Sequence, residues 1–406
     1  MSRHARAQVL CAALVMFSAH AAHAGPITID LPTALARARE RAPDAIAARA
    51  RAVEAEAARA GAAIRFTQNP ELEIGAGPRF GDPTNLTIEA RIEQSLELGR
   101  RGARMRVANA GVDHAVATAD AEIRALGLVI ATTFHEARYA ELLVELTRRG
   151  EQLAARATDV AERRRKAGDI TDLDVDLAKV ARGRARSAVA AAVAERAAAI
   201  GKLAVLIGAA PDDVITLSGE LRSSAVTLEG LRAGLGERAD VRALGAESRL
   251  ATAEGSLATA KGRTNVAVWI GYERDETETI LLGGLRLTLP VWNRAQDGVA
   301  AASARMKRAT LERDAISAAA ARQVVDAFET YTRAREAVEL FESDVLPALV
   351  DSELLLEKSV ETGQLTVSVY LVARQEILAG RREHLDRQLA LAKAADVARF
   401  VAGVMP

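Results

Sequence analysis

The chain has 406 residues, of which half are apolar but only 3% are aromatic, and it carries 54 basic and 54 acidic side chains. This composition excludes a largely disordered chain and argues against an aromatic-rich globular core. The formal net charge of zero gives no support to nucleic-acid binding, which requires a basic stripe.

The N-terminal residues 1–24 have the pattern of a secretory signal peptide. Arg3 and Arg6 precede the apolar stretch 9–17, and Ala22-His23-Ala24 fits the small-x-small rule for cleavage. An N-terminal membrane anchor is the alternative, but the apolar stretch is too short to span a bilayer. We therefore predict an exported protein.

The mature chain is expected to begin at Gly25 and to contain no cysteine, because Cys11 lies within the signal. Disulfides, cysteine-bound metals and a lipid anchor are then not expected. After residue 24 no stretch reaches the ~18 uncharged apolar residues of a membrane-spanning helix.

The first part of the mature chain changes from a helical to a strand pattern. Residues 31–64 have helical apolar spacing, with Pro43-Asp44 as a start signal inside it. Residues 70–80 and 85–98 then predict two strands joined by a turn at Gly81-Asp82-Pro83. In the second strand one face is apolar and consists of Leu86, Ile88, Ala90 and Ile92.

A helical pattern returns over 100–166 and keeps a spacing of seven, which is typical of a helix that coils against neighbours. Gly168 and Thr171 predict a tight hairpin tip, with the glycine ending one helix and the threonine capping the next. The returning helix is predicted over 171–206, and residues 209–228 are interpreted as a connector.

The same order then occurs a second time. The landmark pairs Pro43 and Ala239, Leu96 and Leu289, and Gly168 and Gly363 are separated by 196, 193 and 195 residues. The second set comprises strands over 265–272 and 279–291, a long helix over 295–361 that Pro347 should kink, a tip near 363, and a helix over 366–402.

The chain is therefore predicted to contain two tandem repeats, 25–228 and 229–406, each a long helical hairpin with a strand pair, near 70–98 and 265–291. In the first repeat the two shorter helices, 34–63 and 171–208, should stack end to end beside the long one, since their summed length matches that of 100–166. The predicted architecture is an α+β membrane protein.

Four amphipathic strands are too few to close a membrane barrel, because bacterial barrels begin at eight strands. Open strand edges cannot face lipid, so several chains must share one barrel, and three chains give twelve strands. The helices would continue this barrel as a tube. A soluble helical bundle with a small sheet is the alternative that periodicity leaves open.

Four motifs resemble outer-membrane efflux channels of the TolC-like family. They are the junctions 92–105 (IEQSLELGRRGARM) and 285–294 (LRLTLPVWNR) and the tips 167–174 (AGDITDLD) and 361–366 (ETGQLT). The resemblance covers residues 30–403 and is strongest to the CzcC-like branch that serves heavy-metal exporters.

This resemblance implies a homotrimer with a 12-stranded outer-membrane β-barrel above a long periplasmic α-helical barrel. It also implies a periplasmic adaptor (membrane fusion) protein and an inner-membrane RND-type pump as partners, with heavy-metal cations as substrates. Drug efflux or type I polypeptide secretion through the same architecture is the alternative, and a soluble periplasmic coiled-coil scaffold is the second. A periplasmic adaptor is a less fitting candidate, because it would have a single hairpin.

Three aspartates that follow the first tip, Asp172, Asp174 and Asp176, are the candidate periplasmic gate. In a trimer they would form a ring of carboxylates that attracts cations. The alternative is that they only stabilise the positive end of a helix. The family commonly has its acidic ring after the second tip, where this chain has valines.

The remaining candidate residues are contact positions. The tips should meet the adaptor through Gly168, Asp169, Thr171, Gly363, Gln364 and Thr366, and the strand-to-helix junctions comprise Gly99, Arg100, Arg101, Trp292, Asn293 and Arg294. The basic stretch 163–166 is either a solvated helix end or a contact with the adaptor or the neighbouring tip.

No catalytic, cofactor or metal site is predicted. The mature histidines His114, His135 and His384 lack metal-ligand spacing, and no nucleophile or phosphate-loop pattern is present in the sequence. We therefore predict a passive conduit and not an enzyme.

Overall fold

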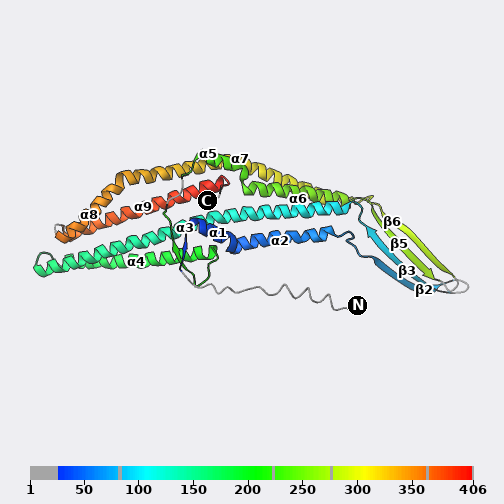
Figure 1. Cartoon of the computed structure of the whole chain (residues 1–406), viewed down its shortest axis with the longest axis horizontal. Coiled ribbons are helices and arrows are strands. Elements are labelled where there is room, and N and C mark those ends of the chain that lie inside the picture. Colours follow the sequence, from blue (N-terminus) through cyan, green and yellow to red (C-terminus); the bar gives the residue numbers. More distant parts are fainter. Residues whose placement is uncertain (1–25, 81–84, 222–224, 275–277, 363–364, 405–406) are drawn as a thin grey trace, which may run out of the picture.

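The computed structural model describes residues 26–80, 85–221, 225–274, 278–362 and 365–404, which form a long rod (Figure 1). A sheet lies at one end of the rod and the helical hairpin tips lie at the other. The first repeat contains β1 (Pro26–Ile29), α1 (Leu31–Arg41), α2 (Pro43–Ala63), β2 (Glu71–Arg79), β3 (Asn85–Leu96), α3 (Arg100–Ala167) and α4 (Asp172–Leu206).

The second repeat has the same order of long elements. It follows β4 (Val214–Leu217), which lies at the end of the first repeat, and contains α5 (Leu228–Gly234), a 3₁₀ turn (Leu235–Glu237), α6 (Ala239–Lys261), β5 (Asn265–Arg274), β6 (Thr279–Thr288), α7 (Gln296–Leu340), a π-helical segment (Phe341–Val345), α8 (Leu346–Thr362) and α9 (Val367–Val401). The starts of α2, β2, β3, α3 and α4 precede those of α6, β5, β6, α7 and α9 by 194 to 196 residues. The predicted tandem arrangement of hairpins and strand pairs is confirmed.

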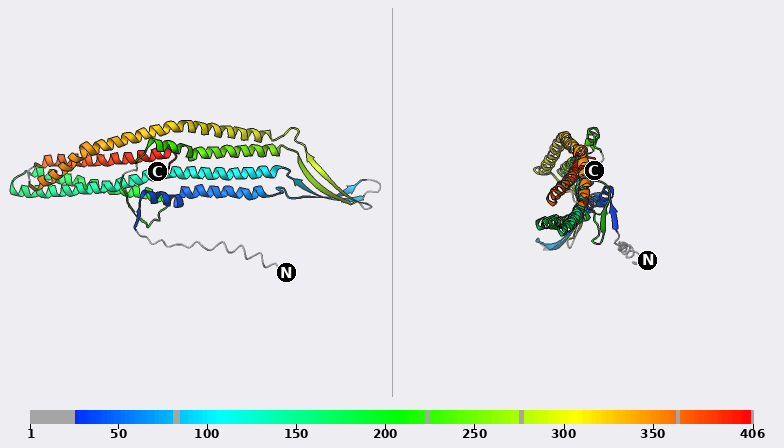
Figure 2. Two further views of the ribbon diagram at one scale, coloured as in Figure 1. Left: turned by 45° about the horizontal axis from the view of Figure 1, so that its top comes forward. Right: turned by 90° about the vertical axis from the view of Figure 1, so that its left-hand side faces the viewer.

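The 68-residue helix α3 is the central support of the rod. Helices α2 and α4 lie end to end along it, with α1 between them (Figures 1 and 2). The predicted stacking of two shorter helices beside a long one is therefore confirmed. Helix α3 also packs against α6 and α9, so it joins the two repeats.

Small side chains form most of the seams between these helices, because they let the backbones approach closely. Along α3 the buried positions include Ala103, Ala108, Ala119, Ala131, Ala137, Ala140, Ala154, Ala157 and Ala161. This use explains why a chain with half its residues apolar contains so few aromatic residues.

The largest cluster of buried side chains lies at the middle of the rod, where Ile130 and Phe134 of α3 meet Leu203 of α4. Strands β1 and β4 cover this cluster as a parallel pair, with Ile29 opposite Leu217. The connector over residues 209–228 contains β4, a strand that the sequence analysis did not predict. Four residues are too few for a clear alternation, and the partner strand is far away in sequence.

The second long helix is interrupted near Pro347, as predicted. Helix α7 ends at Leu340, a π-helical segment follows, and α8 begins at Leu346. Proline has no N–H and cannot bond to the carbonyl four residues earlier, so the helix widens and bends there. Figure 1 shows this bend, which carries α8 toward α9.

The four-stranded sheet is antiparallel with the order β2-β3-β5-β6, so the two repeats meet at the β3–β5 pair. Within the described ranges no helix is long and apolar enough to cross a bilayer. The predicted signal peptide with Cys11, the turn at Gly81-Asp82-Pro83, and Gly363 and Gln364 lie outside the described residues.

Candidate functional site

One face of the sheet carries apolar side chains on all four strands. The register places Ile74, Ala90, Tyr272 and Leu281 in one row across the sheet. Ile74 is 70% exposed and Leu281 is 72% exposed. The other exposed apolar residues of this face are Leu72, Leu86, Ile88, Ile92, Val268, Ile270, Leu285 and Leu287. An exposed apolar surface of this extent on a single chain indicates a face that a membrane or another protein covers.

The opposite face of the sheet is mostly polar. Its charged residues include Glu71, Glu73, Glu89, Arg91, Glu93, Glu273 and Arg286. Arg286 Nη1 lies 2.9 Å from Glu93 Oε1, and the Arg91 guanidinium lies 4.1 Å from the centre of the Trp269 ring. The sheet thus separates an apolar side from a water-compatible side.

Both outer strands of the sheet have a free edge. Among the described residues, β2 pairs only with β3 and β6 pairs only with β5. These edges are nine and ten residues long. Unpaired backbone N–H and C=O groups are costly away from water and form a ready surface for another strand.

The first strand-to-helix junction is held by arginine side chains. Gly99 has a φ of 76° and turns the chain from β3 into α3. Arg100 donates to the carbonyls of Ala260, Lys261 and Arg263, at the end of α6, over 3.1 to 3.3 Å. Arg101 donates to the Ala63 carbonyl at the end of α2 over 3.1 Å.

These positive groups bind the unpaired carbonyls that a helix leaves at its C-terminus. The predicted junction residues therefore connect three helices beneath the sheet. Sequence reasoning did not single out Arg104, which donates to the Ile64 carbonyl over 2.6 Å and contacts Glu97.

The second junction has a different construction. Ala295 takes the left-handed conformation with a φ of 58°, where the first repeat has Gly99. The Asn293 side chain accepts from the Ala295 N–H over 2.9 Å, and the Gln296 side chain accepts from the Arg294 N–H over 2.7 Å. Trp292 is 88% exposed, so its large ring is free to contact a lipid interface or another chain.

The first hairpin tip forms as predicted. Gly168 has a φ of 86° and ends α3, and Thr171 caps α4. The Thr171 side chain accepts from the Asp174 N–H, and the Asp174 carboxylate accepts from the Thr171 N–H over 3.0 Å, which is a capping box.

Each of the three candidate gate aspartates has a local partner. Asp172 forms a two-contact ion pair with Arg165 over 2.5 and 2.9 Å, and Asp176 lies 3.8 Å from Lys179. The Arg165 hydrogen bonds lower the pKa of Asp172, and hydrogen bonds from Thr171 lower the pKa of Asp174. Asp172 and Asp176 are exposed and Asp174 is half-buried, and the gating role of the three stays a prediction.

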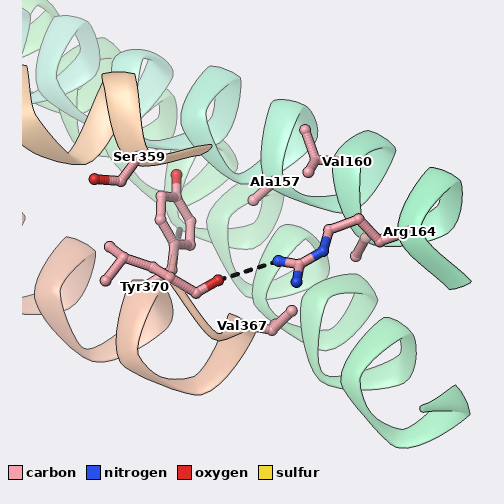
Figure 3. A pocket seen from close by; sticks show the side chains of 8 residues that line it. Ala157, Val160, Arg164, Ser359, Val367 and Tyr370 are labelled. Carbon is pink, nitrogen blue, oxygen red and sulfur yellow. Dashed lines mark hydrogen bonds between the residues drawn. The ribbon is translucent and has the colours of Figure 1, made fainter. Parts of the chain in front are cut away.

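The two tips touch each other within one chain. Arg164 Nη1 donates to the Leu365 carbonyl over 3.2 Å. This side chain borders a small apolar cavity of about 30 Å³ between the ends of α3, α8 and α9, which Figure 3 shows with Ala157, Val367 and Tyr370 around it. Thr366 caps α9 by accepting from the Val369 N–H over 3.4 Å.

The basic stretch before the first tip has mixed roles. Arg164 contacts the second tip and Arg165 pairs with Asp172, whereas Arg163 donates to the Asp159 carbonyl of its own helix over 3.3 Å. Of the two interpretations, contact with the neighbouring tip is observed for Arg164. Contact with an adaptor stays a prediction.

Sequence reasoning missed two residues that connect α9 to α3 above the tips. Tyr370 donates to the Leu153 carbonyl over 3.1 Å, and Arg374 donates to the Gly150 carbonyl over 2.9 and 3.2 Å. Arg374 is only 9% exposed, and burial lowers its pKa. The available signal was a tyrosine and an arginine four residues apart on one helix face. Each of them donates to a backbone carbonyl, and such a partner cannot be recognised from the sequence because every residue has one.

Two of the three histidines of the mature chain, His135 and His384, have structural neighbours. His135 Nε2 lies 3.0 Å from Asp396 Oδ2 and joins α3 to α9, and His384 stacks on Phe341 at the π-helical segment. Throughout the described ranges, no group of three or more His, Cys, Asp or Glu side chains is placed to hold a metal ion.

No protein-family model matches the sequence, and no curated protein matches it. Solved structures do match over 92% of this chain. They include a membrane protein from Pseudomonas aeruginosa (19% identity, 93% of that chain, TM-score 0.71), the outer-membrane channel OprN (18%, 89%, 0.71) and CusC, which forms a transmembrane channel (16%, 92%, 0.71). At these identities the likeness concerns the fold. The chain therefore has the fold of these membrane proteins, two of which are described as channels.

Proposed function

We propose that this protein is the outer-membrane channel subunit of a tripartite efflux system and a member of the TolC-like family. The observation that carries the proposal is the sheet, which has a continuous apolar face, a polar face and two free edges. A helical rod supports this sheet and ends in two hairpin tips. The likeness in fold to outer-membrane channels supports the same conclusion.

Three copies are proposed to complete the channel. The free edge of β2 would pair with the free edge of β6 in the next copy, which satisfies both rows of backbone groups. Three four-stranded sheets give a 12-stranded barrel with the apolar face toward lipid and the polar face toward the pore. The helices beneath would form the periplasmic tube.

The proposed location is the outer membrane, with the helical tube in the periplasm. Residues 1–24 are proposed to direct export and to be removed, without lipidation of the mature chain. A soluble scaffold would leave the apolar sheet face in water, which disfavours that alternative.

The two tips are proposed to dock a periplasmic adaptor, which would join the channel to an inner-membrane RND-type pump. Gly168, Asp169, Thr171 and Thr366 lie at the rod's end opposite the sheet, where such a partner would meet it. The protein itself is proposed to be a passive conduit and not an enzyme.

Heavy-metal cations are the proposed substrates, on the resemblance of the sequence motifs to the CzcC-like branch. Drugs and secreted polypeptides are the alternatives. Growth of a deletion strain on zinc, cobalt or cadmium salts and on a panel of organic inhibitors distinguishes them, because only loss of metal tolerance supports the first.

The acidic residues at the first tip are proposed to form a ring at the periplasmic mouth. Asp176 has the longest ion-pair distance, 3.8 Å to Lys179, and is the most available of the three for a passing cation. Asp176→Asn should reduce the preference of the open channel for cations, measured as a reversal potential across a planar bilayer. An unchanged potential would leave these residues as helix caps only.

The experiment that tests the channel is fractionation of the full-length protein, followed by its mass in mild detergent. Outer-membrane location with a mass near three chains is the expected result, and a soluble periplasmic monomer would overturn it. Leu72 and Glu73 are adjacent in β2 on opposite faces and form a matched pair. Leu72→Lys should cost about 2–4 kcal/mol at mid-membrane depth and deplete the inserted trimer, whereas Glu73→Lys should not.

A further inference from the structure

We propose that a basic collar at the base of the sheet binds the headgroups of anionic phospholipids in the membrane leaflet nearer the helices. The collar consists of the four linkers between the helices and the sheet, together with the two helix residues next to each linker. The linkers are residues 64–70, 97–99, 262–264 and 289–295. The inference rests on the proposed function for its place at a membrane surface, and it adds the class of lipid that this surface selects.

The collar marks the boundary between an apolar and a water-compatible part of the rod. On one side of it is the apolar face of the sheet, whose end nearest the helices contains Leu72, Val268 and Leu287. On the other side the helices carry exposed ion pairs, such as Arg305 of α7 with Glu254 of α6 over 2.7 Å. Figure 1 shows the collar between the sheet and the helix ends. A membrane that covers the apolar face therefore ends at the collar.

Large apolar side chains of the collar are exposed on the single chain. Phe66, Leu98, Leu289, Val291 and Trp292 are each more than half exposed, and they come from three of the four linkers. A tryptophan ring combines an apolar body with an N–H group that stays hydrated, so it favours the zone between hydrocarbon and water. These side chains suit the edge of a bilayer.

Positive charge is concentrated in the same segments. The collar has two acidic residues, Glu97 and Asp297, and six basic residues, which are Arg65, Arg100, Arg101, Lys261, Arg263 and Arg294. Glu97 also contacts Arg104 of α3, which lies just outside the collar. Over the whole chain basic and acidic side chains are equal in number, at 54 each, so the excess of positive charge is local.

The six basic groups of the collar have no acidic partner of their own. Within the part of the chain that the structure describes, none of them forms an ion pair. Arg100 and Arg101 donate to carbonyl oxygens at the ends of helices, and these carbonyls are uncharged, so each arginine keeps its full positive charge. The excess charge is therefore left for a ligand.

Two guanidinium groups are fixed in place while their outer nitrogens stay open. Arg101 donates through Nε to the Ala63 carbonyl over 3.1 Å, and Arg294 donates through Nε to the Pro290 carbonyl over 3.3 Å. No described residue accepts a hydrogen bond from the terminal nitrogens of either side chain, and both side chains are exposed. Such N–H groups form the planar fork that binds two phosphate oxygens at once. This geometry is an independent indication of a phosphate ligand.

The combination of these groups selects an anionic phospholipid. The arginine forks bind its phosphate, side chains such as Phe66 and Trp292 contact its acyl chains, and its net charge balances the collar. Phosphatidylcholine carries a cation that cancels its phosphate, and a free phosphate ion has no acyl chains. Clusters of about four to eight Lys and Arg residues beside a membrane-embedded segment are typical of proteins that recognise anionic lipids.

Lipid contact at the collar is measured with the fluorescence of Trp292. Phosphatidylglycerol and phosphatidylcholine with brominated acyl chains are titrated separately onto the full-length protein in detergent, because bromine quenches an indole that it touches. The other tryptophan of the chain, Trp269, lies under Arg91 on the polar face of the sheet, and a Trp292→Phe variant measures its background. Half-maximal quenching is expected at a concentration of phosphatidylglycerol about fivefold lower, or more, than that of phosphatidylcholine.

Arg294→Gln removes one positive charge next to Trp292 in the linker. It should raise the half-quenching concentration of phosphatidylglycerol about fivefold, which is the contribution of one arginine near an anionic membrane surface. Phosphatidylcholine should quench this variant and the wild type alike, which shows that the variant is folded. The matched control is Arg184→Gln, which removes an exposed arginine of α4 away from the collar and should behave as the wild type does.

Salt and inorganic phosphate identify the ligand. Raising the salt from about 0.1 M to 1 M should remove the preference for phosphatidylglycerol, since it shortens the screening length from about 10 Å to 3 Å. Inorganic phosphate at the same concentration as the lipid should not displace phosphatidylglycerol. Displacement would overturn the proposal, because the collar would then bind the ion and not the lipid.

The outcomes separate this proposal from the proposed function. Equal quenching by the two lipids, or an equal loss in Arg184→Gln, overturns the lipid site. A trimeric channel without a preference for phosphatidylglycerol refutes the lipid site alone. A monomer that prefers phosphatidylglycerol but forms no channel refutes the proposed function alone.

Discussion

The two repeats differ at the residues that begin, bend and end their helices. In the first repeat, α3 follows a left-handed glycine and runs 68 residues without interruption. In the second repeat, α7 follows a left-handed alanine, runs 45 residues and gives way to a π-helical segment before Pro347. The first tip has a capping box, and the second has a single threonine cap.

The buried positions, in contrast, are shared. Ile130 and Val324, Ala137 and Tyr331, and Val144 and Val338 are each 194 residues apart, and all six are buried. A common spacing of core residues therefore gives both repeats the same fold. The residues that begin, bend and end the helices then leave α3 of the first hairpin uninterrupted and allow the long helix of the second hairpin to bend before Pro347.

The largest expected effect concerns this shared core. Ile130→Ala should lower the free energy of unfolding by about 2–5 kcal/mol, because it removes three buried carbons from a closely packed cluster. Val324→Ala removes two and should cost about 2 kcal/mol. Denaturant unfolding followed by circular dichroism measures both values, with the exposed Glu329→Ala as control. A larger loss in Val324→Ala would contradict the equivalence of the two positions, because that variant removes fewer buried carbons.

Pro347→Ala should reduce the difference between the two long helices. A proline inside a helix costs about 3 kcal/mol, but the stacking of Phe341 on His384 stabilises the present bend, so we expect a gain of about 1 kcal/mol. The bend should straighten and move the second tip. Spin labels on cysteines introduced at Asp169 and Ser368 measure this distance, and an unchanged value would assign the bend to the Phe341–His384 contact instead.

Gly99 and Ala295, which both have the left-handed backbone conformation, allow a reciprocal exchange of glycine and alanine. Gly99→Ala should destabilise the protein and Ala295→Gly should stabilise it, each by about 1 kcal/mol, because a side chain in this conformation is strained. Thermal unfolding of both variants measures the effect. Changes of the same sign in both variants would mean that the contacts of the junction, and not the backbone conformation, decide stability.

The smallest expected effect separates the two tips. Thr171→Ala should cost about 1 kcal/mol locally, and Thr366→Ala should cost less, since its cap has one hydrogen bond at 3.4 Å and no capping box. Hydrogen exchange of the first-turn amides of α4 and α9 measures this difference. Equal losses of hydrogen-exchange protection in α4 and α9 would show that the capping box does not stabilise the first tip beyond a single threonine cap.

Lowering the pH provides a control for the comparison between the two tips. The pKa of Asp174 is lowered below its usual value of 3.8 by the hydrogen bonds from Thr171. A lowered pKa stabilises the tip above pH 3.8, and this contribution is lost as the pH falls through the lowered value. The first tip should therefore lose its extra protection in strong acid, and the second tip, which has Val369 in the corresponding position, should not.

Much of the fold could be predicted from the sequence because it depends on local spacing. The alternation from Leu86 to Ile92 and the glycine at the first tip, Gly168, determine strands and a turn over a few residues. The interruption at Pro347 is equally local. The predicted helix and strand boundaries consequently agree with the structure within a few residues.

What the sequence could not reveal depends on pairing between distant segments. The β1–β4 pair joins residues 188 positions apart, and Arg374 binds a backbone carbonyl of α3. Neither has a local signature.

The parallel pairing of β1 with β4 has a consequence for the order of assembly. The chain is synthesised from its N-terminus, so β1 with Ile27 and Ile29 is made long before its partner strand β4. The β1–β4 pair can form only once Ile215 and Leu217 have been synthesised. Pairing of α3 with α4 brings those residues close, which shortens the search. Strand β1 can therefore pair only after the first helical hairpin, α3 and α4, has formed. In a chain truncated before residue 214, β1 should lack its partner strand and be cleaved more readily by proteases.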